Sequence, residues 1–207
     1  MQELYKQLII KIYLNSLLGK KSTVKELAKD LNLEENHVRK LCDLMKEKEL
    51  ILELNDEFKL TNLGRSNIKV VFTGGVFDVI HPGHVFTLSS AKSLGDVLVV
   101  VIARDKTVLK NKGRNPFNSE EQRLELVKSL KFVDAAILGS EANIFESVIK
   151  VKPDIIALGY DQKYDELELE KEAKKHDLSI KFVRLGTKMP DIKTSKIIGN
   201  KKIIDEF

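Results

Sequence analysis

The chain has 207 residues, of which 43% are hydrophobic and 32% charged, a composition that excludes the disordered and low-complexity classes. Its longest apolar run, residues 97–103, is far shorter than the roughly 20 residues that a membrane span requires, and the N-terminus lacks the pattern of a secretory signal. We therefore expect a cytoplasmic protein; the net charge of +4 fits phosphorylated ligands but does not establish a nucleic-acid partner.

The first third of the chain shows helical periodicity. Apolar residues recur every three or four positions over residues 4–18, a capping-box pattern begins a second helix at Thr23, and a third helix is expected over residues 34–48. Residues 51–60 alternate in polarity and predict a hairpin. This order, with the segment TVKELAKDLNLEENHVRKLCDLMKEKELI, resembles the winged helix-turn-helix family over roughly residues 4–66.

That resemblance implies a recognition helix, residues 34–48, that lies in the major groove of DNA. The charges are nearly balanced, because residues 1–67 hold 12 Lys or Arg and 11 Asp or Glu. Arg39, Lys40 and Lys59 are candidates for phosphate contacts. DNA binding and a purely structural or dimer-forming role both remain open.

The polar segment of residues 61–67 predicts a domain boundary, which gives a first domain over 1–67 and a second over 68–207. Beyond it strands and helices alternate, with nearly continuous apolar runs at 97–103 and 154–158. The pattern predicts an α/β fold with a Rossmann-like, parallel five-stranded sheet and helices on both faces. We expect strands at 69–73, 97–103, 133–138, 154–158 and 179–185, and helices at 83–94, 119–130, 144–150, 167–176 and from about 194.

The segment GGVFDVIHPGH, residues 74–84, follows the first strand of the predicted sheet. Glycines there let a ligand approach the backbone, and Pro82 and Gly83 begin a helix whose positive N-terminal end favours phosphate. His81 and His84 are three residues apart and face the same side. The other interpretations are a pair of capping histidines or a metal site, although His37 and His176, in other helices, supply no ligand spacing.

The motif His-x-Gly-His after a first strand, read with the later segments, resembles the cytidylyltransferase-like nucleotidyltransferases over residues 69–207. The resemblance implies transfer of a nucleotide to a phosphorylated acceptor with release of pyrophosphate. His81 and His84 would stabilise the charge on the triphosphate, and Mg²⁺ would be carried mainly by the phosphates. Lys110, expected in a charged loop that could close over phosphates, and Arg123, expected near the phosphates, complete the predicted catalytic set.

Other segments contain further residues that are expected to bind the nucleotide. Asp105 follows the second strand, Gly159 after the fourth strand admits a base, and Asp161 accepts a hydrogen bond from the ribose or the base. Arg184 and Thr187, with the helix start at Thr194 and Ser195, resemble the second signature of the family. The predicted nucleotide-binding residues are Gly74, Val76, Phe77, His81, Pro82, Gly83, His84, Asp105, Gly159, Asp161, Arg184, Thr187, Thr194 and Ser195.

The segments RDKTV, FNSEEQRLELVKSLKFVDAAILG and DIIALGYDQ resemble archaeal FAD synthases. That likeness implies transfer of AMP from ATP, the co-substrate, to FMN. One alternative is cytidylyl transfer to glycerol 3-phosphate or another polyol phosphate, and a second is a nucleotide-sensing regulator that binds DNA. A homodimer is a further candidate assembly.

Overall fold

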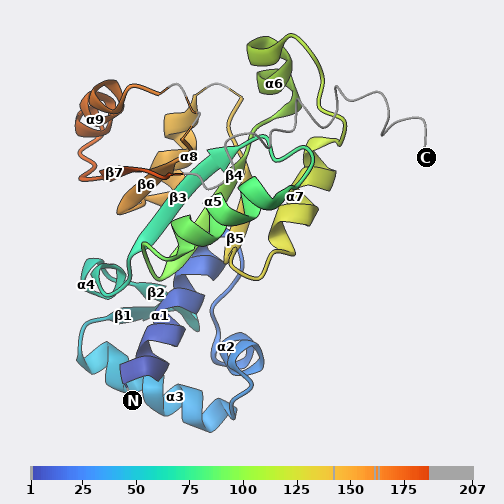
Figure 1. Cartoon of the computed structure of the whole chain (residues 1–207). Coiled ribbons are helices and arrows are strands. Elements are labelled where there is room, and N and C mark those ends of the chain that lie inside the picture. Colours follow the sequence, from blue (N-terminus) through green and yellow to red (C-terminus); the bar gives the residue numbers. More distant parts are fainter. Residues whose placement is uncertain (1, 142, 161, 163, 187–207) are drawn as a thin grey trace. The chain divides into compact units, whose positions relative to one another are not determined.

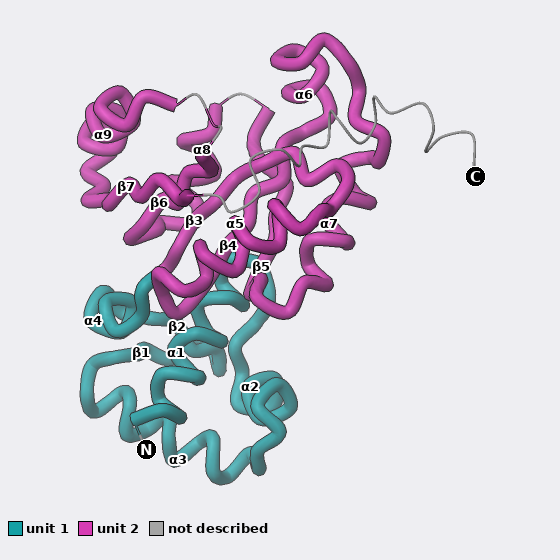
Figure 2. Tube along the Cα trace, viewed as in Figure 1, with its two compact units in different colours: residues 1–69 teal, residues 70–207 magenta. Residues whose placement is uncertain are grey.

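The computed structural model describes residues 2–141, 143–160, 162 and 164–186, and the chain divides into two compact units (Figure 2), residues 1–69 and 70–207. Along the described residues, no helix is long and apolar enough to cross a lipid bilayer.

Unit 1 contains the three helices and the hairpin that the sequence predicts. The helices are α1 (Gln2–Leu17), α2 (Val24–Leu31) and α3 (Glu35–Glu47), and the antiparallel hairpin joins β1 (Ile51–Leu54) to β2 (Glu57–Leu60). The Thr23 hydroxyl accepts a hydrogen bond from the Glu26 amide at 3.2 Å and begins α2 as expected. Asn55 and Asp56 both adopt positive φ, which matches the twist of a two-residue hairpin turn.

The segment of residues 61–67, where the sequence predicts a domain boundary, contains a short helix that was not predicted, α4 (Asn62–Ser66). The Thr61 hydroxyl caps this helix by accepting a hydrogen bond from the Gly64 amide at 2.9 Å. A Cβ at Gly64 would lie 1.9 Å from the carbonyl oxygen of Leu50. Gly64 is therefore required for close packing of α4 against the chain before the hairpin.

Unit 2 is built on a five-stranded parallel sheet in the order β5-β4-β3-β6-β7, which confirms the predicted α/β fold (Figure 1). The strand order reverses between β3 and β6, the position at which open parallel sheets bind ligands. The strands are β3 (Val70–Gly75), β4 (Val97–Ile102), β5 (Ala135–Leu138), β6 (Ile155–Leu158) and β7 (Lys181–Arg184).

Helices cover both faces of this sheet. Figure 1 shows α5 and α7 in front of the sheet and α8 behind it. On the first face Leu88 of α5 and Val127 of α7 pack with Leu98, Val100 and Ile102 of β4, and all six residues of β4 are buried. The helices are α5 (Pro82–Lys92), α6 (Asp105–Lys112), α7 (Glu120–Lys128), α8 (Ile144–Val151) and α9 (Glu166–Lys175).

The helix α6 differs from the expectation, because a charged loop was predicted where Asp105–Lys112 form two turns of helix. The helix ends at Gly113, whose φ of +69° is the left-handed conformation that commonly terminates helices. The helix predicted from about residue 194 lies outside the described residues.

Candidate active site

The two motif histidines lie at the start of α5, directly beyond the end of β3. His81 is the residue before the helix, Pro82 occupies its first turn, and the His84 amide donates to the His81 carbonyl oxygen at 2.9 Å. The imidazole rings are stacked, with centroids 3.8 Å apart and an angle of 22° between planes. The first turn of α5 carries no acidic residue. Both rings therefore face one side of a helix N-terminus, as expected from the spacing, next to backbone amides that favour an anion.

The two glycines that end β3 differ in how much space a Cβ atom would have at each position. A Cβ at Gly75 would lie 2.7 Å from the ring of Phe77, which is 5% exposed and has a φ of +51°. At Gly74 a Cβ would find its nearest neighbour at 3.6 Å, an ordinary contact. The Phe77 ring also meets His84 edge-on at 5.2 Å between centroids. Gly75 thus leaves room for the buried Phe77 ring to pack against His84, whereas the close-approach role predicted for Gly74 stays a prediction.

Arg123 has no exposed side-chain surface, and its guanidinium joins three separate segments around the histidines. Its Nη1 donates to the carbonyl oxygen of Val76 at 2.6 Å, Nη2 to that of Ala103 at 2.8 Å, and Nε to that of Asn118 at 3.1 Å. Nη2 also pairs with Asp105 at 2.6 Å. These bonds brace the loops that follow β3 and β4. Because the Arg123 side chain has no exposed surface, a direct phosphate contact, which the resemblance implied, would require the surrounding loops to open.

Asp78 also connects the loop after β3 to the segment that precedes α7. Its buried carboxylate accepts hydrogen bonds from the amides of Phe117 and Asn118, both at 2.9 Å, and the Asn118 side-chain amide donates back to the Asp78 carbonyl oxygen at 2.6 Å. The histidine-bearing loop is therefore fixed to the segment between α6 and α7.

Asp105 and Glu120 cap each other's helices. The Asp105 amide donates to the Glu120 carboxylate at 2.7 Å, and the Glu120 amide donates to the Asp105 carboxylate at 3.3 Å. Arg104 pairs with Glu120 at 2.8 Å. Asp105 thus neutralises Arg123 and begins α6, and its predicted contact with a nucleotide stays a prediction.

The remaining residues predicted near the histidines are more open. Val76 is half-buried and supplies a carbonyl to Arg123, Pro82 is exposed on the first turn of α5, and Gly83 beside it is half-buried. Lys110 is exposed in the last turn of α6, where it extends from a helix and not from a loop. Its approach to a bound phosphate stays a prediction.

A residue that the sequence-based prediction missed, Gln162, connects the ends of the two central strands. Its Oε1 accepts from the Gly159 amide at 2.9 Å, and its Nε2 donates to the Gly74 carbonyl oxygen at 2.7 Å. Gln162 therefore links the end of β6 to the end of β3, where the strand order reverses. Its place in the segment GYDQ gave a family resemblance but no signal of this bridging role.

Arg184, at the end of β7, binds the loop that follows β6. Its guanidinium donates to the carbonyl oxygens of Gly159 at 3.3 Å, Gln162 at 2.8 Å and Tyr164 at 2.9 Å, and pairs with Glu166 at 2.9 Å. It positions the Gly159 loop in this structure, and its predicted nucleotide contact stays a prediction. Four predicted residues lie outside the described residues: Asp161, Thr187, Thr194 and Ser195.

The described residues contain no group of three His, Cys, Asp or Glu side chains placed to hold a metal ion. The groups that the structure describes at His81 and His84 are two imidazoles and the backbone amides of a helix N-terminus. Such a set stabilises negative charge that develops on a phosphate group.

Comparisons with known proteins agree with this geometry. The Cytidylyltransferase-like family model matches residues 72–200. The FAD synthase of Thermoplasma volcanium is 47% identical over 138 residues, covering 67% of this chain and 95% of that protein, and the FAD synthase of Methanothermus fervidus is 55% identical over 129 residues, covering 60% and 88%. A solved structure, described as the lipopolysaccharide core biosynthesis protein from Thermoplasma volcanium, is 49% identical with a TM-score of 0.56 and covers 58% of this chain and 98% of that one.

The family match extends over more than half of the chain, and it includes the end of β3, both histidines, Arg123 and the end of β6. By its sequence, its parallel sheet and the stacked imidazoles at the reversal of strand order, the chain belongs to the cytidylyltransferase-like family.

Proposed function

We propose that this chain is an FMN adenylyltransferase, which transfers AMP from ATP to FMN and produces FAD and pyrophosphate. The observation that supports nucleotidyl transfer is the stacked pair His81 and His84 at the N-terminus of α5. The observation that favours FMN is the name FAD synthase carried by relatives that are 47–55% identical to this chain.

In this reaction an oxygen of the FMN phosphate attacks the α-phosphorus of ATP. The bond from that phosphorus to the oxygen bridging to the β-phosphate breaks, and pyrophosphate leaves with the electron pair. No covalent intermediate on the protein and no change of oxidation state is needed. The protein has to position the two phosphates and stabilise the charge that accumulates between them.

Each part of the site has a role in this proposal. His81 and His84, with the amides that begin α5, bind the phosphates of ATP and stabilise the departing pyrophosphate. Gly159 and Gln162 hold the β6 end, where the base binds. Lys110 approaches the phosphates from α6. Mg²⁺ enters on the triphosphate, because this ion retains most of its waters and binds substrate phosphates in preference to protein cages.

Four reaction mixtures test the activity and its competitor. Purified protein with Mg²⁺ receives ATP or CTP, each with FMN or glycerol 3-phosphate, and pyrophosphate is measured. We expect the ATP and FMN mixture to be the fastest. Faster release with CTP and glycerol 3-phosphate would replace this assignment with the cytidylyltransferase, and nucleotide binding without release in any mixture would favour a nucleotide sensor.

The histidine pair is tested by His84→Ala, which we expect to lower kcat by about 10²- to 10³-fold, the usual cost of one lost transition-state donor. The matched control is His176→Ala, because His176 lies at the end of α9 and is not part of the predicted site. Circular dichroism establishes that both variants are folded. A folded His84→Ala protein with wild-type turnover would contradict the proposed role of the pair.

For unit 1 we infer a winged helix-turn-helix, in which α3 is the recognition helix and β1 and β2 form the wing. Two of the basic residues of α3 are already paired, since Arg39 and Lys46 each contact Glu53 of β1 at 2.6 Å. These two contacts give Lys46 and Arg39 raised pKa values and lower that of the Glu53 carboxyl. DNA phosphates would have to compete with Glu53 for both side chains.

DNA binding and homodimer formation by the whole chain are tested separately. A gel-shift assay with genomic fragments at low salt, with and without FMN, tests DNA binding, and an absence of retardation would exclude it under those conditions. Sedimentation of the full chain measures the oligomeric state, for which a mass of one chain would exclude the dimer.

A further inference from the structure

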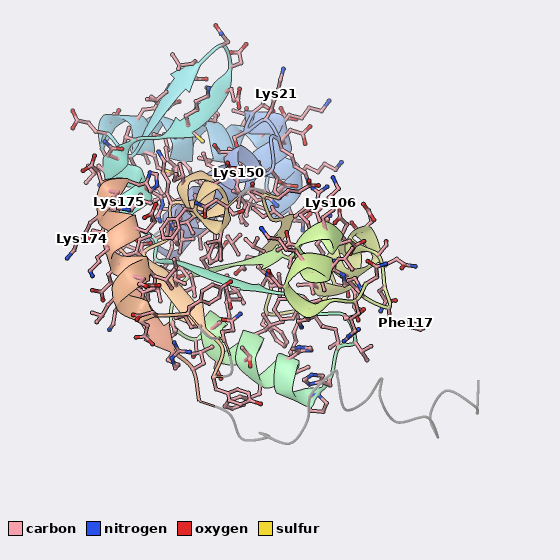
Figure 3. The ribbon with its side chains drawn as sticks, turned by 90° about the horizontal axis from the view of Figure 1, so that it is seen from above. Lys21, Lys106, Phe117, Lys150, Lys174 and Lys175 are labelled. Atoms are coloured by element: carbon pink, nitrogen blue, oxygen red, sulfur yellow. The ribbon has the colours of Figure 1, made fainter. Side chains whose placement is uncertain are left out.

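Phe117 is the large apolar side chain with the highest exposure among the described residues, at 80%. It belongs to the segment between α6 and α7, and Figure 3 shows it projecting outward beside these helices. Single exposed apolar residues are common on protein surfaces, so exposure alone does not indicate a site. The surroundings of Phe117 are what distinguish it.

The backbone that carries this ring is held firmly. The Phe117 amide and the Asn118 amide donate to the two oxygens of Asp78, a residue that is only 3% exposed. The Asn118 side chain donates to the Asp78 carbonyl oxygen, and the Asn118 carbonyl oxygen accepts from Arg123 at 3.1 Å. An exposed ring on a fixed backbone can receive a ligand with little further loss of conformational entropy.

The same contacts place Phe117 beside the candidate active site. Asp78 is three residues before His81, and its neighbour Phe77 contacts the His84 ring. The segment with Phe117 follows β4, whereas Gly159 and Gln162 follow β6, and these two strands lie on opposite sides of β3. If the base of ATP occupies the β6 side, the acceptor approaches the α-phosphorus from the β4 side.

We propose that Phe117 is a specificity-determining residue on which the flat ring system of the acceptor FMN stacks, an inference that rests on the proposed function. A planar aromatic ligand fits an exposed phenyl ring because aromatic faces attract one another in offset stacking. A small polyol phosphate has no surface of this kind. Phe117 therefore selects a flavin acceptor, while the histidine pair acts on the phosphates that every acceptor of the family shares.

The test compares three substitutions in the full chain: Phe117→Ala, Phe117→Leu and Phe117→Tyr. Leu167→Ala is the matched control, because Leu167 is 67% exposed on α9, a helix that follows β6. Pyrophosphate release gives kcat and the KM values for FMN and ATP. Quenching of FMN fluorescence, in the presence of Mg²⁺ and a non-hydrolysable ATP analogue, measures acceptor stacking without turnover.

We expect Phe117→Ala and Phe117→Leu to raise the KM for FMN about tenfold, since one aromatic stacking contact is worth on the order of this factor. Both should reduce the quenching of FMN fluorescence and leave the KM for ATP unchanged. Phe117→Tyr retains a ring and should resemble the wild type, as should Leu167→Ala.

Two results would overturn the inference. The first is a KM for FMN and a quenching of FMN fluorescence in Phe117→Ala that equal those of the wild type. The second is a change in the melting temperature or sedimenting mass of Phe117→Ala, which would show that the ring packs against protein. Failure of the proposed function is distinct, because the wild type would then form no FAD. In that case loss of quenching in Phe117→Ala still supports a flavin-stacking surface, and equal quenching in both proteins opposes it.

Discussion

Replacement of Arg123 by Met separates a bracing role from a catalytic one. The substitution keeps much of the length of the side chain but removes every donor. It leaves the carbonyl oxygens of Val76, Ala103 and Asn118, three half-buried residues, without the buried donor that they share. The stability of unit 2, and not only its turnover, should fall.

The expected size follows from the three carbonyl contacts. A buried acceptor left without a partner costs about 1–3 kcal/mol, and because water reaches part of these three half-buried residues we take the lower end, about 3 kcal/mol for the three together. The ion pair with Asp105 adds little, because that carboxylate is 38% exposed and screened by water. Domains are usually stable by about 5–15 kcal/mol, so this loss is a large fraction of the total.

Urea unfolding followed by circular dichroism measures the effect, and the midpoint of unit 2 should fall by about 1 M or more. Lys128→Met, on the same helix but with a solvent-exposed ion pair, should shift the free energy of unfolding by no more than about 0.5 kcal/mol. An unchanged midpoint in Arg123→Met, together with a large loss of FAD formation, would refute the bracing role and assign the guanidinium to a phosphate.

Three further predictions concern unit 1. Gly64→Ala should lower its free energy of unfolding by more than about 2 kcal/mol in the same urea assay, since the new Cβ would meet the Leu50 carbonyl oxygen; an unchanged midpoint would contradict this packing. Burial raises the pKa of the Cys42 thiol to about 11, so iodoacetamide should label it only after unfolding, and rapid labelling of the native chain would oppose this. The hydrogen bond from Lys46 lowers the pKa of Glu53; its contribution, about 0–1 kcal/mol, is present above the ordinary Glu pKa near 4.3 and is lost as pH falls below that value. The difference in melting temperature between the wild type and Glu53→Gln should therefore shrink between about pH 6 and pH 3, and a constant difference would contradict the pairing.

Features that depend on near neighbours in the chain were predicted well. The spacing of His81 and His84 indicated that both imidazoles face one side, and the rings are stacked. The capping pattern at Thr23 indicated the start of a helix, and the Thr23 hydroxyl accepts a hydrogen bond from the Glu26 amide there. In each case the interacting groups are three residues apart, so local helical geometry alone brings them together.

The parallel sheet was predicted, but the individual side-chain contacts between distant segments were not. Arg123 was expected near phosphates, but its partners at Val76 and Ala103 lie 47 and 20 residues away and are set by the alignment of β3 with β4. The bridge formed by Gln162 to Gly74 spans 88 residues. Neither contact leaves a periodic signal in the sequence, because its partners are backbone atoms that every residue type supplies.

The helix α6 shows a different reason for a missed element. Its sequence, DKTVLKNK, is rich in charge and has a single buried residue, Val108, so the apolar stripe that usually indicates a helix is absent. Its ends are stabilised by Glu120, which accepts from the Asp105 amide, and by the left-handed Gly113. The helix therefore depends on a carboxylate 15 residues away.

The pairing of β3 with β6 determines when the proposed enzyme can first bind its substrates. The Val70 amide bonds to Asp154, and the Thr73 hydroxyl to the Ala157 carbonyl oxygen, across 84 residues in each case. At about 5–20 residues per second, a ribosome takes roughly 4–17 s to synthesise that interval. A nascent chain therefore exposes its histidines for seconds before the strand that completes their surroundings exists, and we expect ATP binding only after translation has passed β6.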